Sequence, residues 1–129
     1  MKPAILLCAL GLSGCINLSA VTTPSPSRTA ALDDPAETIE VSAGAALGFE
    51  CWYNNFLENR PCAKARAKTL DTNIAQVFPA YLDHLLLDYH WRRSQNPVGF
   101  VVVGISPGTT ILRIEIDGTN DEYAVTVVE

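Results

Sequence analysis

The sequence predicts a mainly β fold of the sandwich type, and three observations lead to it. Every second residue from Leu112 to Ile116 is apolar, with Arg113 and Glu115 between them, as in a strand with one buried face. Residues 99–103 are apolar almost throughout, which is typical of an interior strand. Turn residues at 106–108 and 118–121 separate these segments, and short strands divided by such turns indicate two packed sheets.

The remaining strands follow from the same alternation. Residues 38–41 place Ile39 and Val41 on one face, and residues 46–52 alternate in the same way. Residues 123–128 form a Val-rich final strand after the turn at 118–121. At least five short strands are therefore expected.

Residues 73–93 do not fit this pattern. Apolar residues recur there at spacings of three and four, which favours a short amphipathic helix around residues 79–91, inserted into the sandwich. Pro79 is compatible with a first helical turn. The alternative divides the stretch at Pro79 into two strands, residues 74–78 and 84–91, as a regular sandwich requires.

The chain has 129 residues and a formal net charge of -5, which allows one domain and gives no electrostatic reason to bind nucleic acid. Residues 15–37 are rich in Ser, Thr, Pro and Ala without a sustained apolar period. This composition predicts a flexible tether, and residues 38–129 are expected to form the folded domain.

The N-terminal segment has the pattern of a secretion signal. Lys2 precedes an apolar run of about ten residues, which is too short to span a bilayer. The sequence Leu12-Ser13-Gly14-Cys15 then resembles the lipobox of bacterial lipoproteins. The resemblance implies that residues 1–14 are a signal peptide and that Cys15 carries acyl chains such as palmitate. Because Ile16 rather than Asp follows the cysteine, it also implies the outer membrane, with the domain facing the periplasm.

The C-terminal strands resemble bacterial immunoglobulin-like domains of the invasin and intimin type. The matching stretch is Val103-Gly-Ile-Ser-Pro-Gly-Thr-Thr110 followed by two apolar strands, and Ile39-x-Val41-x-x-Gly44 matches the first strand of that family. The resemblance implies an immunoglobulin-like β-sandwich. The middle of the chain departs from the family, because residues 73–93 carry the helical pattern.

The cysteines then divide by position. Cys8 leaves with the signal peptide and Cys15 is acylated, so Cys51 and Cys62 remain to pair outside the cytoplasm. The spacing of these two residues matches no zinc pattern, and neither a metal nor a cofactor is expected.

Two groups of residues are candidates for binding a partner. Trp52, Tyr53 and Phe56 lie in the loop that the disulfide closes, where aromatic side chains make a preorganised contact surface or, alternatively, cap the core. If residues 63–70 form a strand, its basic side chains share one face, which would meet an acidic partner or simply protect a sheet edge. These basic residues are Lys64, Arg66 and Lys68.

No catalytic motif is present in the sequence, and the chain is not expected to be an enzyme. His84 and Asp88 are four apart, a spacing more typical of a surface ion pair than of a catalytic base with its orienting carboxylate. The sequence therefore predicts a lipid-anchored, non-catalytic binding or assembly module of the cell envelope, with another envelope protein as its partner.

The alternative is a protease inhibitor or ligand-binding lipoprotein of immunoglobulin-like fold. Asn96-Pro-Val-Gly-Phe100 is similar to a loop of chagasin-type cysteine protease inhibitors. One residue of that loop is missing here, and no Arg-Pro-Trp loop follows Ile116.

Overall fold

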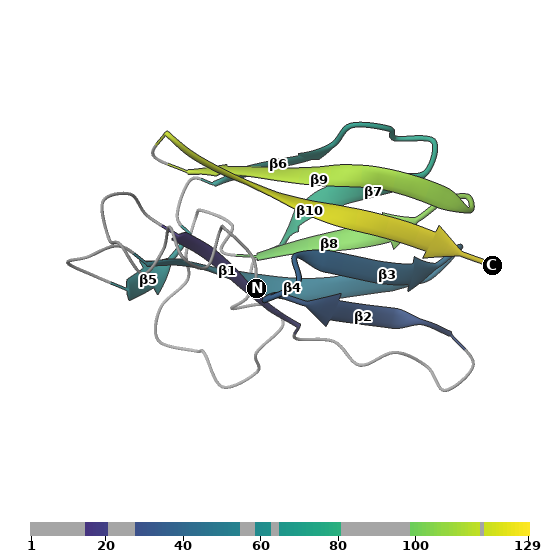
Figure 1. Ribbon diagram of the computed structural model, residues 1–129, viewed down its shortest axis with the longest axis horizontal. Helices are drawn as coiled ribbons and strands as arrows, with labels where there is room; N and C mark the ends of the chain where they lie inside the picture. The colour runs from purple at the N-terminus through teal and green to yellow at the C-terminus, as the bar shows by residue number, and fades with distance from the viewer. Residues whose placement is uncertain (1–14, 21–27, 55–58, 63–64, 81–98, 117) are drawn as a thin grey trace.

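The chain folds into two β-sheets packed face to face (Figure 1), which confirms the predicted β-sandwich. The computed structural model describes residues 15–20, 28–54, 59–62, 65–80, 99–116 and 118–129. Sheet A has the spatial order β1 (Cys15–Ala20), β4 (Ala46–Asn54), β8 (Gly99–Gly104), β7 (Ala75–Ala80), and β5 (Asn59–Pro61) also pairs with β4. Sheet B has the order β2 (Ala30–Asp33), β3 (Thr38–Ser42), β10 (Thr119–Val128), β9 (Gly108–Ile116), β6 (Arg66–Thr69).

Strand pairing is antiparallel except between β3 and β10, which run parallel with Val41 opposite Val127. The hairpin of β9 and β10 is the longest antiparallel pair described, extending from Thr119 opposite Ile116 to Val127 opposite Gly108. The strands expected at 38–41, 46–52, 99–103, 112–116 and 123–128 correspond to β3, β4, β8, β9 and β10. These predictions are confirmed, with ends that differ by a few residues.

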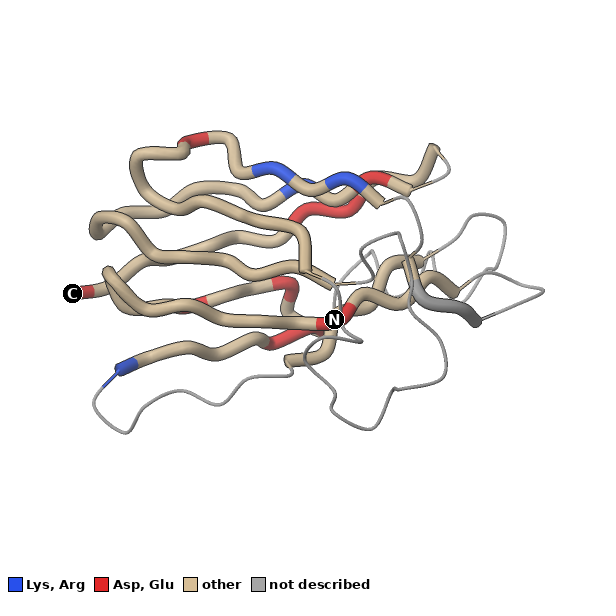
Figure 2. Tube along the Cα trace, turned by 180° about the vertical axis from the view of Figure 1, so that it is seen from behind, with Lys and Arg blue, Asp and Glu red and all other residues tan. Residues whose placement is uncertain are grey.

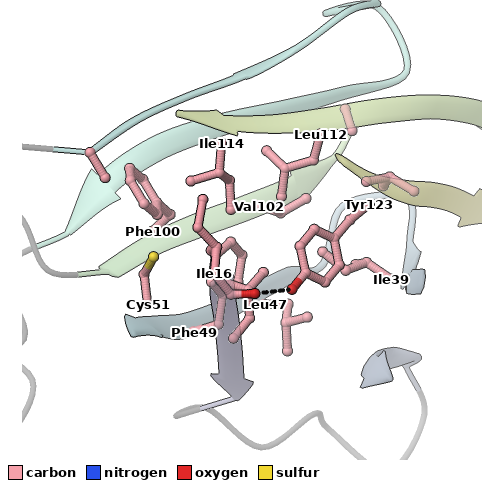
Figure 3. Packing of buried hydrophobic residues seen from close by; sticks show 14 of the residues in the cluster. Ile16, Ile39, Leu47, Phe49, Cys51, Phe100, Val102, Leu112, Ile114 and Tyr123 are labelled. Atoms are coloured by element: carbon pink, nitrogen blue, oxygen red, sulfur yellow. Dashed lines mark hydrogen bonds between the residues drawn. The ribbon is translucent and has the colours of Figure 1, made fainter. Parts of the chain in front are cut away.

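The core lies between the sheets and consists of the inward-facing residues of both (Figure 3). In β9 Leu112, Ile114 and Ile116 are buried, whereas Arg113 and Glu115 face outward, as the alternation predicted. The largest fully buried side chains come from both sheets and include Phe49, Leu47 and Val102 of sheet A and Tyr123, Ile39, Leu112 and Ile114 of sheet B. Burial of these apolar side chains is the main stabilising contribution to such a domain.

The predicted tether contains two strands, β1 and β2, and for these residues the prediction is wrong. β1 pairs with β4 along its whole length, and Ile16 and Leu18 are buried in the core while Asn17 and Ser19 face outward. β2 pairs with β3 and forms an edge of sheet B. Two apolar residues among many Ser, Thr and Pro residues are a weak sequence signal for a strand. Pairing with the long strand β4 nevertheless makes these residues a strand, because tertiary contacts outweigh local preference.

The predicted helix around residues 79–91 does not begin at Pro79, because Pro79 and Ala80 belong to strand β7. The first strand of the alternative, residues 74–78, corresponds to this element. β7 is an edge strand of sheet A, where proline is tolerated because one side of the strand makes no sheet hydrogen bonds. Residues 81–98, which hold the rest of the predicted helix, lie outside the described residues.

Candidate functional site

The residues predicted to bind a partner lie on different sheets. Trp52 is half-buried on β4 in sheet A, and Arg66 and Lys68 are exposed on β6 in sheet B. Tyr53 points inward and is buried, so it belongs to the core. Phe56 and Lys64 lie outside the described residues. The structure therefore does not bring the aromatic and basic groups together into one site.

The predicted disulfide is present between Cys51 and Cys62, with an S–S distance of 2.04 Å. Both residues are buried in the core, and the Cys62 backbone N–H donates to the Cys51 carbonyl at 3.0 Å. The bridge therefore fixes the chain that follows β5 against β4, at the end of sheet A where β1 begins.

Cys15 is the first residue of β1 and is 8% exposed, opposite Asn54 of β4. It is disulfide-bonded in this structure. A disulfide and a thioether-linked lipid are mutually exclusive at one sulfur. The predicted lipidation applies to the chain after removal of residues 1–14, and it stays a prediction.

The two sheets differ strongly in charge (Figure 2). The strands of sheet A contain two charged residues, Glu50 and Arg60. The strands of sheet B contain eight: Asp33, Glu40, Arg66, Lys68, Arg113, Glu115, Asp121 and Glu122. Charged side chains normally cover the outer face of a sheet that meets water, so the outer face of sheet A is the exception.

The centre of this outer face, which we call the neutral face, is formed by the exposed Ala46 and Phe78 and the half-buried Gln76, Val101 and Val103, whereas Gly48 beside them is buried. The register places Val101 between Gly48 on one side and Phe78 on the other. Val103 lies in the same way between Ala46 and Gln76. Phe78 is 49% exposed, one of the most exposed large apolar side chains in the described chain. An uncharged surface of this kind is typical of an interaction site.

Sequence reasoning missed the neutral face although a signal for it was present. The apolar run at residues 99–103 predicts an interior strand, and β8 is one, since it lies between β4 and β7. In the structure only Phe100 and Val102 of this run face the core, whereas Val101 and Val103 face outward. An all-apolar strand in a two-layer sandwich therefore indicates an outer face that is suited to a further contact.

A polar junction connects β1 to sheet B at the edge of the sandwich. The Tyr123 hydroxyl donates a short hydrogen bond to Asp34 Oδ1, which also accepts from the Leu18 backbone N–H at 2.9 Å. The same hydroxyl lies 3.5 Å from the Ile16 carbonyl oxygen (Figure 3). Burial, and then the hydrogen bond to Asp34, raises the pKa of Tyr123 well above its ordinary value. The Tyr123 hydroxyl therefore stays protonated and donates its hydrogen bond to Asp34.

Asp121 lies beside this junction, and the pKa of its carboxyl group is unusually high. Burial, followed by a hydrogen bond with the Glu37 side chain and by the charge of Glu37, raises the pKa of Asp121 to about 8. Asp34 adds to this effect. Asp121 is therefore protonated in the folded domain at neutral pH and donates that proton within the cluster.

The domain is expected to lose stability as the pH rises from about 4 to about 8. Across this range Asp121 holds a proton in the folded state and has lost it in the unfolded state, so the folded state binds more protons and raising the pH favours unfolding. Asp121→Asn is expected to raise the melting temperature by several degrees at about pH 9 and to change it much less at about pH 4. Thermal unfolding followed by circular dichroism measures both values.

Glu40→Gln is the matched control for this experiment, because Glu40 is an exposed carboxylate on β3, in the same sheet. It is expected to change the melting temperature little at either pH. If Asp121→Asn has the same small effect at both pH values, Asp121 is ionised in the folded domain at neutral pH. The assignment of a proton to its carboxyl group is then wrong.

Within the described ranges no three His, Cys, Asp or Glu side chains are grouped so that they could hold a metal ion. No helix in that part of the chain is both long enough and apolar enough to cross a membrane. His84, Asp88 and the first three residues of the inhibitor-like loop at 96–100 lie outside the described residues.

Comparison with known proteins gives a resemblance of fold. No protein-family model matches the sequence, and no curated protein matches it either. Among solved structures, domains 4 and 5 of the S-layer protein SbsC align over 91% of this chain with a TM-score of 0.54 and 13% identity. Domains 5–6 of the same protein align over 87% with a TM-score of 0.52 and 16% identity.

This chain spans 54% of the two-domain SbsC structure and 13% of the structure of SbsC domains 1–6. At these identities the likeness establishes a shared β-rich fold. By its own architecture this chain is a β-sandwich domain.

Proposed function

We propose that this chain is a non-catalytic assembly module of the bacterial cell envelope, which is held at a membrane by lipid on Cys15 and contacts a protein partner through the neutral face. The neutral face is the observation that carries the proposal. It exposes Phe78 and places Val101 and Val103 outward at the centre of a sheet whose strands hold almost no charge. The fold shared with domains of surface-layer proteins supports a structural role.

The position of Cys15 determines how such an anchor would hold the domain. Ile16 and Leu18 are already part of the core, so no tether separates the anchored residue from sheet A. A lipid on Cys15 would therefore hold the sandwich close to the membrane surface. The domain would meet its partner there in a restricted set of orientations, which lowers the entropic cost of assembly.

A photo-crosslinking amino acid at position 101, introduced in intact cells, tests the partner contact. Position 111 is the matched control, because Ile111 is half-buried and faces outward on β9 in the interior of sheet B. We expect a discrete crosslinked product from position 101 and none from position 111. No product from position 101, or an equal yield from both positions, would contradict the proposed docking surface.

A further inference from the structure

We infer that copies of this chain join head to tail through the two edges of sheet B, with strand β6 of one copy pairing antiparallel with strand β2 of the next copy. The inference does not depend on the neutral face, which belongs to sheet A. It follows from the backbone groups that each sheet edge presents and from the charges beside them.

Hydrogen bonds and a proline interrupt both edges of sheet A. On β1 the Leu18 N–H points away from β4 and donates to Asp34 Oδ1 at 2.9 Å. On β7 the Ala75 carbonyl oxygen accepts from the Thr69 hydroxyl at 2.6 Å, and Pro79 has no N–H to donate. Such edges disfavour the addition of another strand, so sheet A is not the sheet that continues into a neighbour.

Sheet B ends in strands β2 and β6, which lie on opposite sides of the sheet (Figure 1). The Ser42 N–H donates to the Thr29 carbonyl oxygen at 2.8 Å. Because hydrogen-bonded and non-bonded positions alternate along an antiparallel pair, the backbone groups of Ala30 and Leu32 then point away from β3. The edge of β2 therefore presents two residues whose N–H and C=O groups are directed outward.

The edge of β6 presents a matching pair of residues. The Leu70 N–H donates to the Ile111 carbonyl oxygen at 3.0 Å, so the backbone groups of Ala67 and Thr69 point away from β9. Among the residues that the structure describes, no side chain caps the outward backbone groups of β6 or β2 as Asp34 caps β1. Sheet B thus has two edges that can each accept a strand by main-chain hydrogen bonds.

The charges beside these edges select which strands pair. Arg66 and Lys68 are exposed on β6, and Lys68 lies opposite Arg113, whose ion pair is with Glu122 at 2.8 Å. Like charges on opposite strand positions are unfavourable, so a further carboxylate beside Lys68 is stabilising. Asp33 is exposed on β2. Two β6 edges repel each other, as two β2 edges do, whereas β6 against β2 joins opposite charges.

One register brings all of the outward backbone groups together. β2 and β6 run in opposite directions within sheet B, so copies in the same orientation pair these strands antiparallel. Pairing Ala30 with Thr69 places Leu32 opposite Ala67, and both pairs then exchange N–H and C=O hydrogen bonds. The inward-facing side chains of the two strands also continue each other, since Ala30 and Thr69 are both buried toward the core.

The same register matches the charged side chains. Arg66 then lies between Asp33 of the next copy and Glu115 of its own sheet. Lys68 is diagonal to Asp33, a distance that a long side chain can span. Each copy has both edges, so the contact repeats and builds a row of copies with sheet B running through it.

The test uses two differently tagged full-length copies expressed together in intact cells, one with a photo-crosslinking amino acid at position 31. Ala31 is exposed on β2, and the register puts it opposite Lys68 of the other copy. We expect a product that carries both tags, in which position 31 is joined to residues 66–69. A crosslinker at position 111, on the outer face of β9, is the matched control and should give no such product.

Lys68→Glu tests the direction of the contact and separates it from loss of the fold. In the copy without the crosslinker it should lower the yield by about tenfold or more, because a carboxylate then faces Asp33. In the copy with the crosslinker it should lower the yield by less than about twofold, because that copy contributes β2. The fold should tolerate the change, since the new carboxylate lies opposite Arg113. Asp33→Lys should show the reverse dependence on the copy that carries it.

Three results would overturn the inference. No product from position 31, or a product that contains a different protein, would show that copies do not pair through β2. A crosslink from position 31 to β2 of the other copy would contradict the head-to-tail geometry, as would an equal loss of yield with either substitution in either copy. These results leave the contact of the neutral face in place, because position 101 tests it separately.

Discussion

Removal of the disulfide by Cys51→Ala and Cys62→Ala together is expected to destabilise the domain by about 3 kcal/mol. The bridge closes a loop between residues that are 11 apart in sequence, and both half-cystines are buried in the core. Loss of the loop constraint increases the entropy of the unfolded chain, and loss of the buried sulfurs removes core contacts. For a domain of this size the melting temperature should fall by roughly 10 °C or more.

Urea denaturation with and without a reducing agent measures this effect. In chains that also carry Cys15→Ser, so that no disulfide forms at Cys15, reductant should lower the midpoint of the chain that keeps Cys51 and Cys62 toward that of the double variant and leave the double variant unchanged. If the double variant unfolds at the same urea concentration as the wild type, the bridge does not contribute to stability, and its predicted role is wrong.

Asp34→Ala is expected to destabilise the domain by about 2–3 kcal/mol, because it leaves the buried Tyr123 hydroxyl without its acceptor. The Leu18 N–H loses its partner in the same variant. The Ile16 carbonyl, at 3.5 Å, is too distant to replace Asp34 in the existing geometry. The junction between β1 and sheet B should therefore weaken, and chemical denaturation measures the change in the free energy of unfolding.

Tyr123→Phe provides the control, since it removes the donor and leaves no unpaired group in the core. It is expected to cost about 1 kcal/mol, and the double variant with Asp34→Ala should cost less than the two single changes together. If the two single changes are additive, the hydrogen bond between Tyr123 and Asp34 does not couple these residues, and the described junction is wrong.

The strands that the sequence predicted correctly share a physical property. β9 and β10 alternate over many residues with turn residues beside them, so local pattern and tertiary packing agree. β1 has only Ile16 and Leu18 facing the core, and its stability depends on pairing with β4, a neighbour distant in sequence. No local pattern carries that information.

The sequence pattern of β7 is ambiguous for a different reason. As a half-buried edge strand it places Ala75 and Val77 inward, and the exposed Phe78 breaks the period of two. The sequence then matches a helical period equally well, and only the pairing with β8 decides between the two. The sequence does not show which residues of β8 face outward, because residues 100–103 are all apolar, and only the packing of the two sheets distinguishes Val101 and Val103 from Phe100 and Val102.

Metabolic labelling with a clickable palmitate analogue, followed by mass spectrometry of the N-terminal peptide of the purified chain, tests directly whether Cys15 carries lipid. We expect label on the wild type, a chain that begins at Cys15, and loss of both in Cys15→Ser, with Cys51→Ser still labelled. An unlabelled chain that retains residues 1–14 and a disulfide at Cys15 would contradict the proposal that lipid on this residue holds the domain in the cell envelope.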